Sequence, residues 1–111
     1  MTGKFYQKLA MRTSNGDLTN EEHLMNGVLG LCGEAGEAAD IVKKYRMQGH
    51  ELNKEHLALE LGDVMWYIAE TATAIGYDLD KIMSMNIDKL LKRYPERFDS
   101  EKSQNRKKGD I

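Results

Sequence analysis

Apolar residues recur along most of this chain at the three- and four-residue spacing that is typical of amphipathic α-helices. Two long segments carry the clearest pattern, one from Thr19 or Asn20 to about Met47 and one from Asn53 to Gly76. At about 100° per residue, the apolar positions of each segment fall into one stripe. The two stripes consist of Leu24, Leu31, Ala35, Ala38, Val42 and Tyr45, and of Leu57, Leu61, Val64, Ile68, Ala72 and Ile75.

Shorter helices are expected on either side of this pair. One covers about Phe5 to Arg12, and the other begins at Asp78 and ends at Tyr94 because Pro95 follows. The apolar side of the last helix is formed by Met83, Ile87, Leu90 and Tyr94. Short connections between amphipathic helices favour antiparallel packing, so we predict an all-α fold, an antiparallel helical bundle of about four helices. We expect residues 1–111 to form one domain, with an extended or disordered polar arm at about 96–111.

Two features of the long helices exceed what a monomeric bundle needs. Glycine occupies every third position of one stretch, and each such glycine costs roughly 0.5–1 kcal/mol relative to alanine unless another backbone approaches closely. These glycines are Gly27, Gly30, Gly33 and Gly36. Leu59 and Trp66 lie one heptad apart on the face opposite the apolar stripe, where a monomer would expose them. We therefore expect the chain to form an oligomer, with a single exposed tryptophan as the alternative.

Composition and charge restrict the classes of function. Charged residues make up 31% of the chain and the formal net charge is −2, which argues against binding polymeric nucleic acid or a membrane through charge alone. No apolar run approaches the roughly 20 residues that span a bilayer. Cys32 is the only cysteine, so no intrachain disulfide can form. We expect a soluble, cytoplasmic protein.

Acidic pairs with the same spacing border the apolar stripes of both long helices. Glu34 and Glu37 form one pair, and Glu60 and Asp63 form the other. If the helices pack antiparallel, the two acidic edges can face each other, and two charges about 5 Å apart at an effective dielectric of about 20 repel by about 3 kcal/mol. A bound cation would relieve this repulsion, and oxygen ligands favour Mg²⁺, with Mn²⁺ as a substitute. A solvated acidic face is the alternative interpretation of either pair by itself.

The last helix carries polar donors that complement these acids. Asn86, Lys89 and Arg93 align on one strip beside its apolar side. Two cations and an amide in one row suit a triphosphate that is bound by a metal and by side chains together.

At these residues the sequence resembles the MazG-like family of all-α nucleoside triphosphate pyrophosphohydrolases. The signature of that family is E-x-x-E followed by E-x-x-D, and here twenty-two residues separate Glu34-Ala-Gly-Glu37 from Glu60-Leu-Gly-Asp63. The surrounding strings GLCGEAGEAADIVKK and ALELGDVMWYI are similar to the family's, as is the N-x-x-K-L-x-x-R-Y-P run that ends at Pro95. The resemblance covers about Glu22 to Arg106.

The resemblance implies a Mg²⁺-dependent hydrolase that converts an NTP or dNTP to NMP or dNMP plus pyrophosphate, in nucleotide-pool control or house-cleaning. It also implies a homodimer or homotetramer whose active sites use more than one subunit. The implied metal ligands are Glu34, Glu37, Glu60 and Asp63, with Glu34 or Glu37 as a candidate for water activation. The implied phosphate ligands are Tyr67, Asn86, Lys89 and Arg93, and Trp66 is a candidate to stack on the nucleobase. The alternative is a non-catalytic helical oligomer that binds metal or nucleotide as a regulator.

Overall fold

The structure is a computed structural model that describes all of residues 1–111, and every regular element in it is a helix. The four predicted helices are present, with ends close to the predicted ones. A short fifth helix lies in the arm that was predicted to be extended or disordered. The helices are α1 (Gly3–Met11), α2 (Asn20–Met47), α3 (Lys54–Ala74), α4 (Leu79–Arg93) and α5 (Ser100–Gln104). None of them is long and apolar enough to cross a membrane.

Side-chain caps explain where the long helices begin. The Thr19 hydroxyl accepts a hydrogen bond from the Glu22 amide, and the Glu22 carboxylate accepts one from the Thr19 amide, so α2 starts with a complete capping box. At α3 and α4 the cap is a single hydrogen bond: the side-chain oxygen of Asn53 accepts from the His56 amide, and that of Asp78 accepts from the Lys81 amide. Gly76 follows α3 with a φ of 80°, a left-handed conformation that lets the chain turn toward α4.

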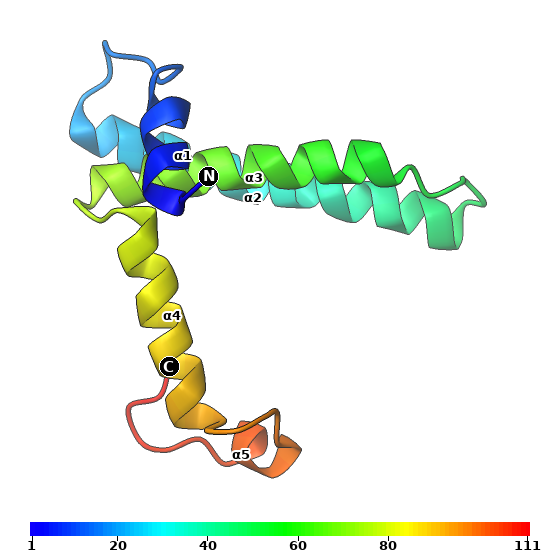
Figure 1. Cartoon of the computed structure of the whole chain (residues 1–111). Helices are drawn as coiled ribbons and strands as arrows, with labels where there is room; N and C mark the ends of the chain where they lie inside the picture. Colours follow the sequence, from blue (N-terminus) through cyan, green and yellow to red (C-terminus); the bar gives the residue numbers. More distant parts are fainter.

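The helices form an open arrangement and not a closed bundle. α2 and α3 pack antiparallel into a long hairpin, α1 lies across α3 and the start of α4, and α4 extends away from the hairpin (Figure 1). The prediction of a four-helix bundle is therefore correct for α2 and α3 and wrong for α4 within one chain. The physical reason is that α1 takes the position beside α3: Gln7 on α1 donates to Thr73 and Tyr77 and accepts from the Leu79 amide.

The buried core is small and lies where α1, α3 and the start of α4 meet. Its buried apolar members are Ala10, Ala69, Ala72 and Leu79. Along the rest of the hairpin and along α4, large apolar side chains remain exposed on the single chain. They include Leu29, Leu59, Leu61, Met65, Met83, Ile87 and Leu91. A monomeric protein rarely exposes so much apolar surface, so these faces are suited to contact with another protein surface.

The repeated glycines of α2 fall into two groups. A Cβ at Gly27 would overlap the Thr71 hydroxyl and lie 3.0 Å from the Thr71 amide nitrogen, and a Cβ at Gly30 would overlap the Tyr67 ring. The expected close approach is therefore present at these two positions, and the neighbour is α3 of the same chain. At Gly33 and Gly36 a Cβ would meet nothing within 4 Å, so packing inside one chain does not explain them.

We predict that Gly27→Ala lowers the free energy of unfolding by about 1–3 kcal/mol, because the added methyl collides with the backbone of α3. The matched control Gly33→Ala should raise it by about 0.5–1 kcal/mol, because alanine is the better helix former where space is open. Urea unfolding followed by circular dichroism at one protein concentration measures both. Equal stability of the two variants would contradict the packing described for Gly27.

Candidate metal centre

The antiparallel pairing of α2 and α3 brings three acidic side chains together. Glu34 projects from α2, and Glu60 and Asp63 project from α3; one carboxylate oxygen of each lies within 4.8 Å of the others. The close approaches of Gly27 to Thr71 and of Gly30 to Tyr67 set this register, since the next turn of α2 then lies opposite Asp63. The predicted meeting of the two acidic edges therefore occurs for these three residues.

Glu37 lies one turn further along α2 and is not one of the three clustered acids. Its side chain is exposed, whereas those of Glu34 and Glu60 are partly buried. It is still close enough for its negative charge to help raise the pKa of Glu34. The predicted set of four carboxylates is thus present as a group of three with Glu37 beside it.

The electrostatics of the cluster disfavour a full set of charges. The neighbouring Glu60 carboxyl, which favours the protonated form of Glu34 as a hydrogen-bond donor, raises the pKa of the Glu34 carboxyl above its ordinary value, and partial burial and the charges of Glu60, Asp63 and Glu37 add to the effect. The Oε1 atom of Glu60 lies 3.3 Å from His56 Nε2, but its Oε2 atom is buried and has no hydrogen-bond partner. A buried carboxylate oxygen without a partner is costly. The residues therefore fit a hard divalent cation, which would satisfy this oxygen and offset the repulsion.

The raised pKa of Glu34 predicts a pH dependence of stability in metal-depleted buffer. Because the folded-state pKa lies above the unfolded one, the stabilising contribution of protonated Glu34 is fully present below the ordinary glutamate pKa. It is lost as the pH rises through the folded value. Thermal melts of wild type and Glu34→Gln at a series of pH values should show the wild type losing stability relative to the variant across that window. A difference that does not change with pH would contradict the shift.

Adding Mg²⁺ should remove this loss of stability in the wild type, because a cation favours the charged carboxylates.

Trp66 and Tyr67 lie beside the acidic cluster but point to different neighbours. The Tyr67 ring packs against Gly30 of α2 and edge-to-face against Trp66, with 5.1 Å between ring centroids. The indole Nε1 of Trp66 donates to the Ala10 carbonyl at 3.0 Å and to the Thr13 hydroxyl at 2.8 Å. The prediction that a monomer would expose Trp66 is wrong, because α1 and the turn after it cover the indole. Leu59 does remain exposed, at 64%.

The row of polar donors on α4 is separate from the acidic cluster within one chain. Asn86 and Lys89 are exposed, and Arg93 makes a two-fold hydrogen bond with Asp110 of the C-terminal arm. Lys89 and Arg93 line a cavity that contains no residue of α2 or α3. The expected convergence of these donors with the carboxylates is therefore absent from the single chain, because α4 diverges from the hairpin (Figure 1).

A buried polar network on the same helices was not foreseen from the sequence. Glu70 is only 1% exposed, and its carboxylate accepts a hydrogen bond from Asn26 at 2.8 Å and contacts His23 Nδ1 at 2.9 Å. The His23 side chain is only 21% exposed. One available signal was the spacing of seven residues from Asp63 to Glu70, which places both on one side of α3.

Tyr6 on α1 was also not foreseen. Burial raises the pKa of the Tyr6 phenol, and the charge of Asp63 adds to the effect. The Tyr6 phenol therefore lies close enough to Asp63 for the charge of that carboxylate to act on it. No spacing rule in the sequence relates α1 to α3, so this proximity could not be predicted.

Comparison with known proteins agrees with the resemblance at the acidic motif. The sequence model of the MazG nucleotide pyrophosphohydrolase domain matches residues 21–98, which include all of α2 except its first residue, α3, α4 and all four acids. The Gene 37 protein of Mycobacterium phage L5 is 39% identical over 82 residues, which cover 70% of this chain and 72% of that protein. No solved structure matches the chain significantly. The chain belongs to the MazG nucleotide pyrophosphohydrolase family.

Proposed function

We propose that this protein is a Mg²⁺-dependent nucleoside triphosphate pyrophosphohydrolase, which converts an NTP or dNTP to the monophosphate and pyrophosphate. The observation that carries the proposal is the crowded carboxylate cluster, in which Glu60 keeps a buried oxygen without a partner. It lies at the acidic motif of a chain that belongs to a nucleotide pyrophosphohydrolase family. Clearing or adjusting a nucleotide pool is the role that this reaction would serve.

The cluster residues Glu34, Glu60 and Asp63 would hold the metal directly, and Glu37 would join them from the adjacent turn in the outer shell of the ion. Carboxylate oxygens favour Mg²⁺, and Mn²⁺ would substitute. When bound, the ion would supply charge neutralisation at phosphate oxygens and a lowered pKa for a bound water.

Side chains of the protein would accept the proton of the attacking water and bind the substrate. Glu37 is exposed and lies outside the group of three, so it is better placed than Glu34 to accept a proton from the attacking water. Tyr67 packs beside the cluster and presents a phenol that can donate to a phosphate oxygen. The single N–H of the Trp66 indole already donates to two acceptors within the chain, the Ala10 carbonyl and the Thr13 hydroxyl. Stacking on a nucleobase would therefore use only the face of the ring.

A second copy of the chain would complete the site. Within a single chain, the donors Asn86, Lys89 and Arg93 lie apart from the acids. The apolar side of α4 is also exposed, at Met83, Ile87 and Leu91. A homodimer or homotetramer that buries this side would cover the exposed apolar surface and bring the donors of one subunit to the acids of another.

The proposal is tested by incubating the protein with a panel of NTPs, dNTPs and modified nucleotides in Mg²⁺ and separating the products by chromatography. We expect at least one nucleotide to be converted to its monophosphate, at a rate that falls to background when Mg²⁺ is removed. A diphosphate product would show a different bond cleavage. Binding of nucleotides without any product would favour the regulator.

A further inference from the structure

One basic side chain contacts the acidic cluster, and the proposed reaction does not use it. The Nε2 atom of His56 lies 3.3 Å from the Oε1 atom of Glu60, one turn further along α3. No Lys or Arg nitrogen lies within 4.0 Å of a carboxylate oxygen of Glu34, Glu60 or Asp63. Within the chain, His56 is therefore the only basic group in contact with the cluster.

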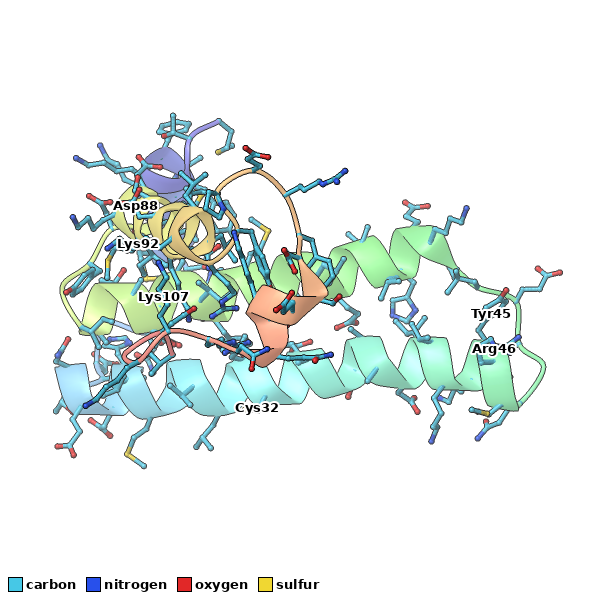
Figure 2. The ribbon with its side chains drawn as sticks, turned by 90° about the horizontal axis from the view of Figure 1, so that it is seen from below. Cys32, Tyr45, Arg46, Asp88, Lys92 and Lys107 are labelled. Carbon is cyan, nitrogen blue, oxygen red and sulfur yellow. The ribbon has the colours of Figure 1, made fainter.

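The place of His56 on the hairpin limits what else can hold Glu60. The end of the hairpin at which α3 begins projects beyond α1, α4 and α5, and Figure 2 shows Tyr45 and Arg46 at this end. The backbone of His56 is fixed there, because its amide donates to the side-chain oxygen of Asn53 at 2.9 Å. The imidazole thus extends toward Glu60 from a capped first turn of α3.

The two oxygens of the Glu60 carboxylate have different surroundings. Oε1 contacts His56, whereas Oε2 is buried and has no hydrogen-bond partner. The Glu60 side chain is only 17% exposed, so this pair differs from the solvated pairs one turn apart that stabilise a helix only slightly. Because both oxygens belong to one planar group, a contact that fixes Oε1 also fixes the direction of Oε2.

We propose that His56 is a positioning residue, whose Nε2–H holds Oε1 of Glu60 so that Oε2 is presented to a divalent cation at Glu34, Glu60 and Asp63. The inference rests on the metal site of the proposed function. Carboxylates that ligate metals are commonly held by outer hydrogen bonds, and loss of such a partner typically weakens metal binding about 10–100-fold.

The geometry of the contact is compatible with this role. The distance of 3.3 Å is slightly longer than the roughly 2.7–3.2 Å of an N–H···O hydrogen bond. The His56 side chain is 55% exposed, so a small rotation of the ring brings the donor into range. The role needs only a hydrogen on Nε2, which a glutamine amide supplies at a similar distance from the backbone.

Two other roles of His56 lead to different expectations. A metal ligand would place a ring nitrogen among the ligand atoms of the cluster, but the group whose atoms lie within 4.8 Å of one another contains only Glu34, Glu60 and Asp63. A partner that only stabilises the helix would act equally with and without a metal. Each alternative can therefore be separated from positioning by metal binding.

Binding of Mn²⁺ to the full chain tests the proposal without any nucleotide. Mn²⁺ substitutes for Mg²⁺ at oxygen ligands, and electron paramagnetic resonance of the free ion gives its Kd. His56→Met and His56→Gln are a matched pair, because the two side chains have similar length and helix propensity but only glutamine carries an N–H. We expect His56→Met to raise the Kd about tenfold and His56→Gln to stay within about threefold of wild type. The control His50→Met, at an exposed position between α2 and α3, should bind as wild type does.

Thermal melts distinguish positioning from a purely structural role. The rise in Tm on adding Mn²⁺ should be larger for wild type and His56→Gln than for His56→Met, because a ligand stabilises the folded state according to its affinity. A Tm difference between wild type and His56→Met that is the same with and without Mn²⁺ would show a structural role and overturn the proposal.

The titration gives three further decisive outcomes. Equal Mn²⁺ affinity of wild type and His56→Met would overturn the proposal. An equal loss of affinity in His56→Met and His56→Gln would also overturn it, because the ring itself would then be required. Wild type that binds no Mn²⁺ would refute both this inference and the proposed metal site. Affinity that follows the N–H donor, in a protein that releases pyrophosphate from no nucleotide, would support the role of His56 and refute only the proposed hydrolysis.

Discussion

Asp63→Asn is expected to lower kcat by about a thousandfold or more in Mg²⁺, because it removes a charged oxygen from the proposed metal site. Asp63 is the exposed member of the group of three, so its side chain is accessible to substrate as well as to an ion. Steady-state measurement of pyrophosphate release gives kcat. The matched control is Asp17→Asn in the exposed turn before α2, which should leave kcat unchanged.

The same variant distinguishes a metal site from a structural one. If the acids are held together for a cation, removing one negative charge relieves repulsion, so in metal-depleted buffer Asp63→Asn should melt no earlier than wild type. Mg²⁺ should raise the Tm of wild type more than that of the variant. Full activity of the purified variant would refute the assignment of Asp63. A large fall of its Tm without metal would show that the carboxylate serves the fold.

Glu70→Ala is expected to lower the free energy of unfolding by about 3 kcal/mol, because it removes a buried acceptor and leaves His23 and Asn26 without their partner. For a domain of this size, a loss of that order lowers Tm by roughly 10–20 °C. Thermal melts by circular dichroism at a fixed protein concentration measure the change. Glu55→Gln, at an exposed position in the first turn of α3, is the control. A Tm within a few degrees of wild type would show that the network contributes little.

Local signals in the sequence were sufficient to predict the α2–α3 hairpin that carries the acidic residues. α2 begins after its Thr19 cap and α3 ends just before Gly76, close to the ends that the sequence predicted. Because α2 and α3 are long, amphipathic and joined by a short connection, the meeting of Glu34 with Asp63 follows from their antiparallel packing. Helix length and periodicity therefore predicted this part of the candidate site.

Contacts between segments that are distant in the sequence could not be predicted from the spacing of apolar residues. Whether α1 or α4 covers α3 depends on the hydrogen bonds of Gln7 and of the Trp66 indole, and no spacing rule contains them. The same choice directs Arg93 toward Asp110 and away from the acids. Glu70 was missed because a helical glutamate has the same local pattern whether it is solvated or buried. These features required tertiary structure.

The central claim is that the protein releases pyrophosphate from a nucleoside triphosphate in a reaction that needs a divalent metal. ³¹P nuclear magnetic resonance of one reaction mixture, with the substrate identified by the nucleotide panel, tests it most directly because it resolves every phosphorus product. We predict that Mg²⁺ converts the three triphosphate resonances to one monophosphate and one pyrophosphate resonance. Without metal, or with Asp63→Asn, the spectrum should not change. Appearance of orthophosphate and a nucleoside diphosphate, or the same conversion without metal, would contradict the account.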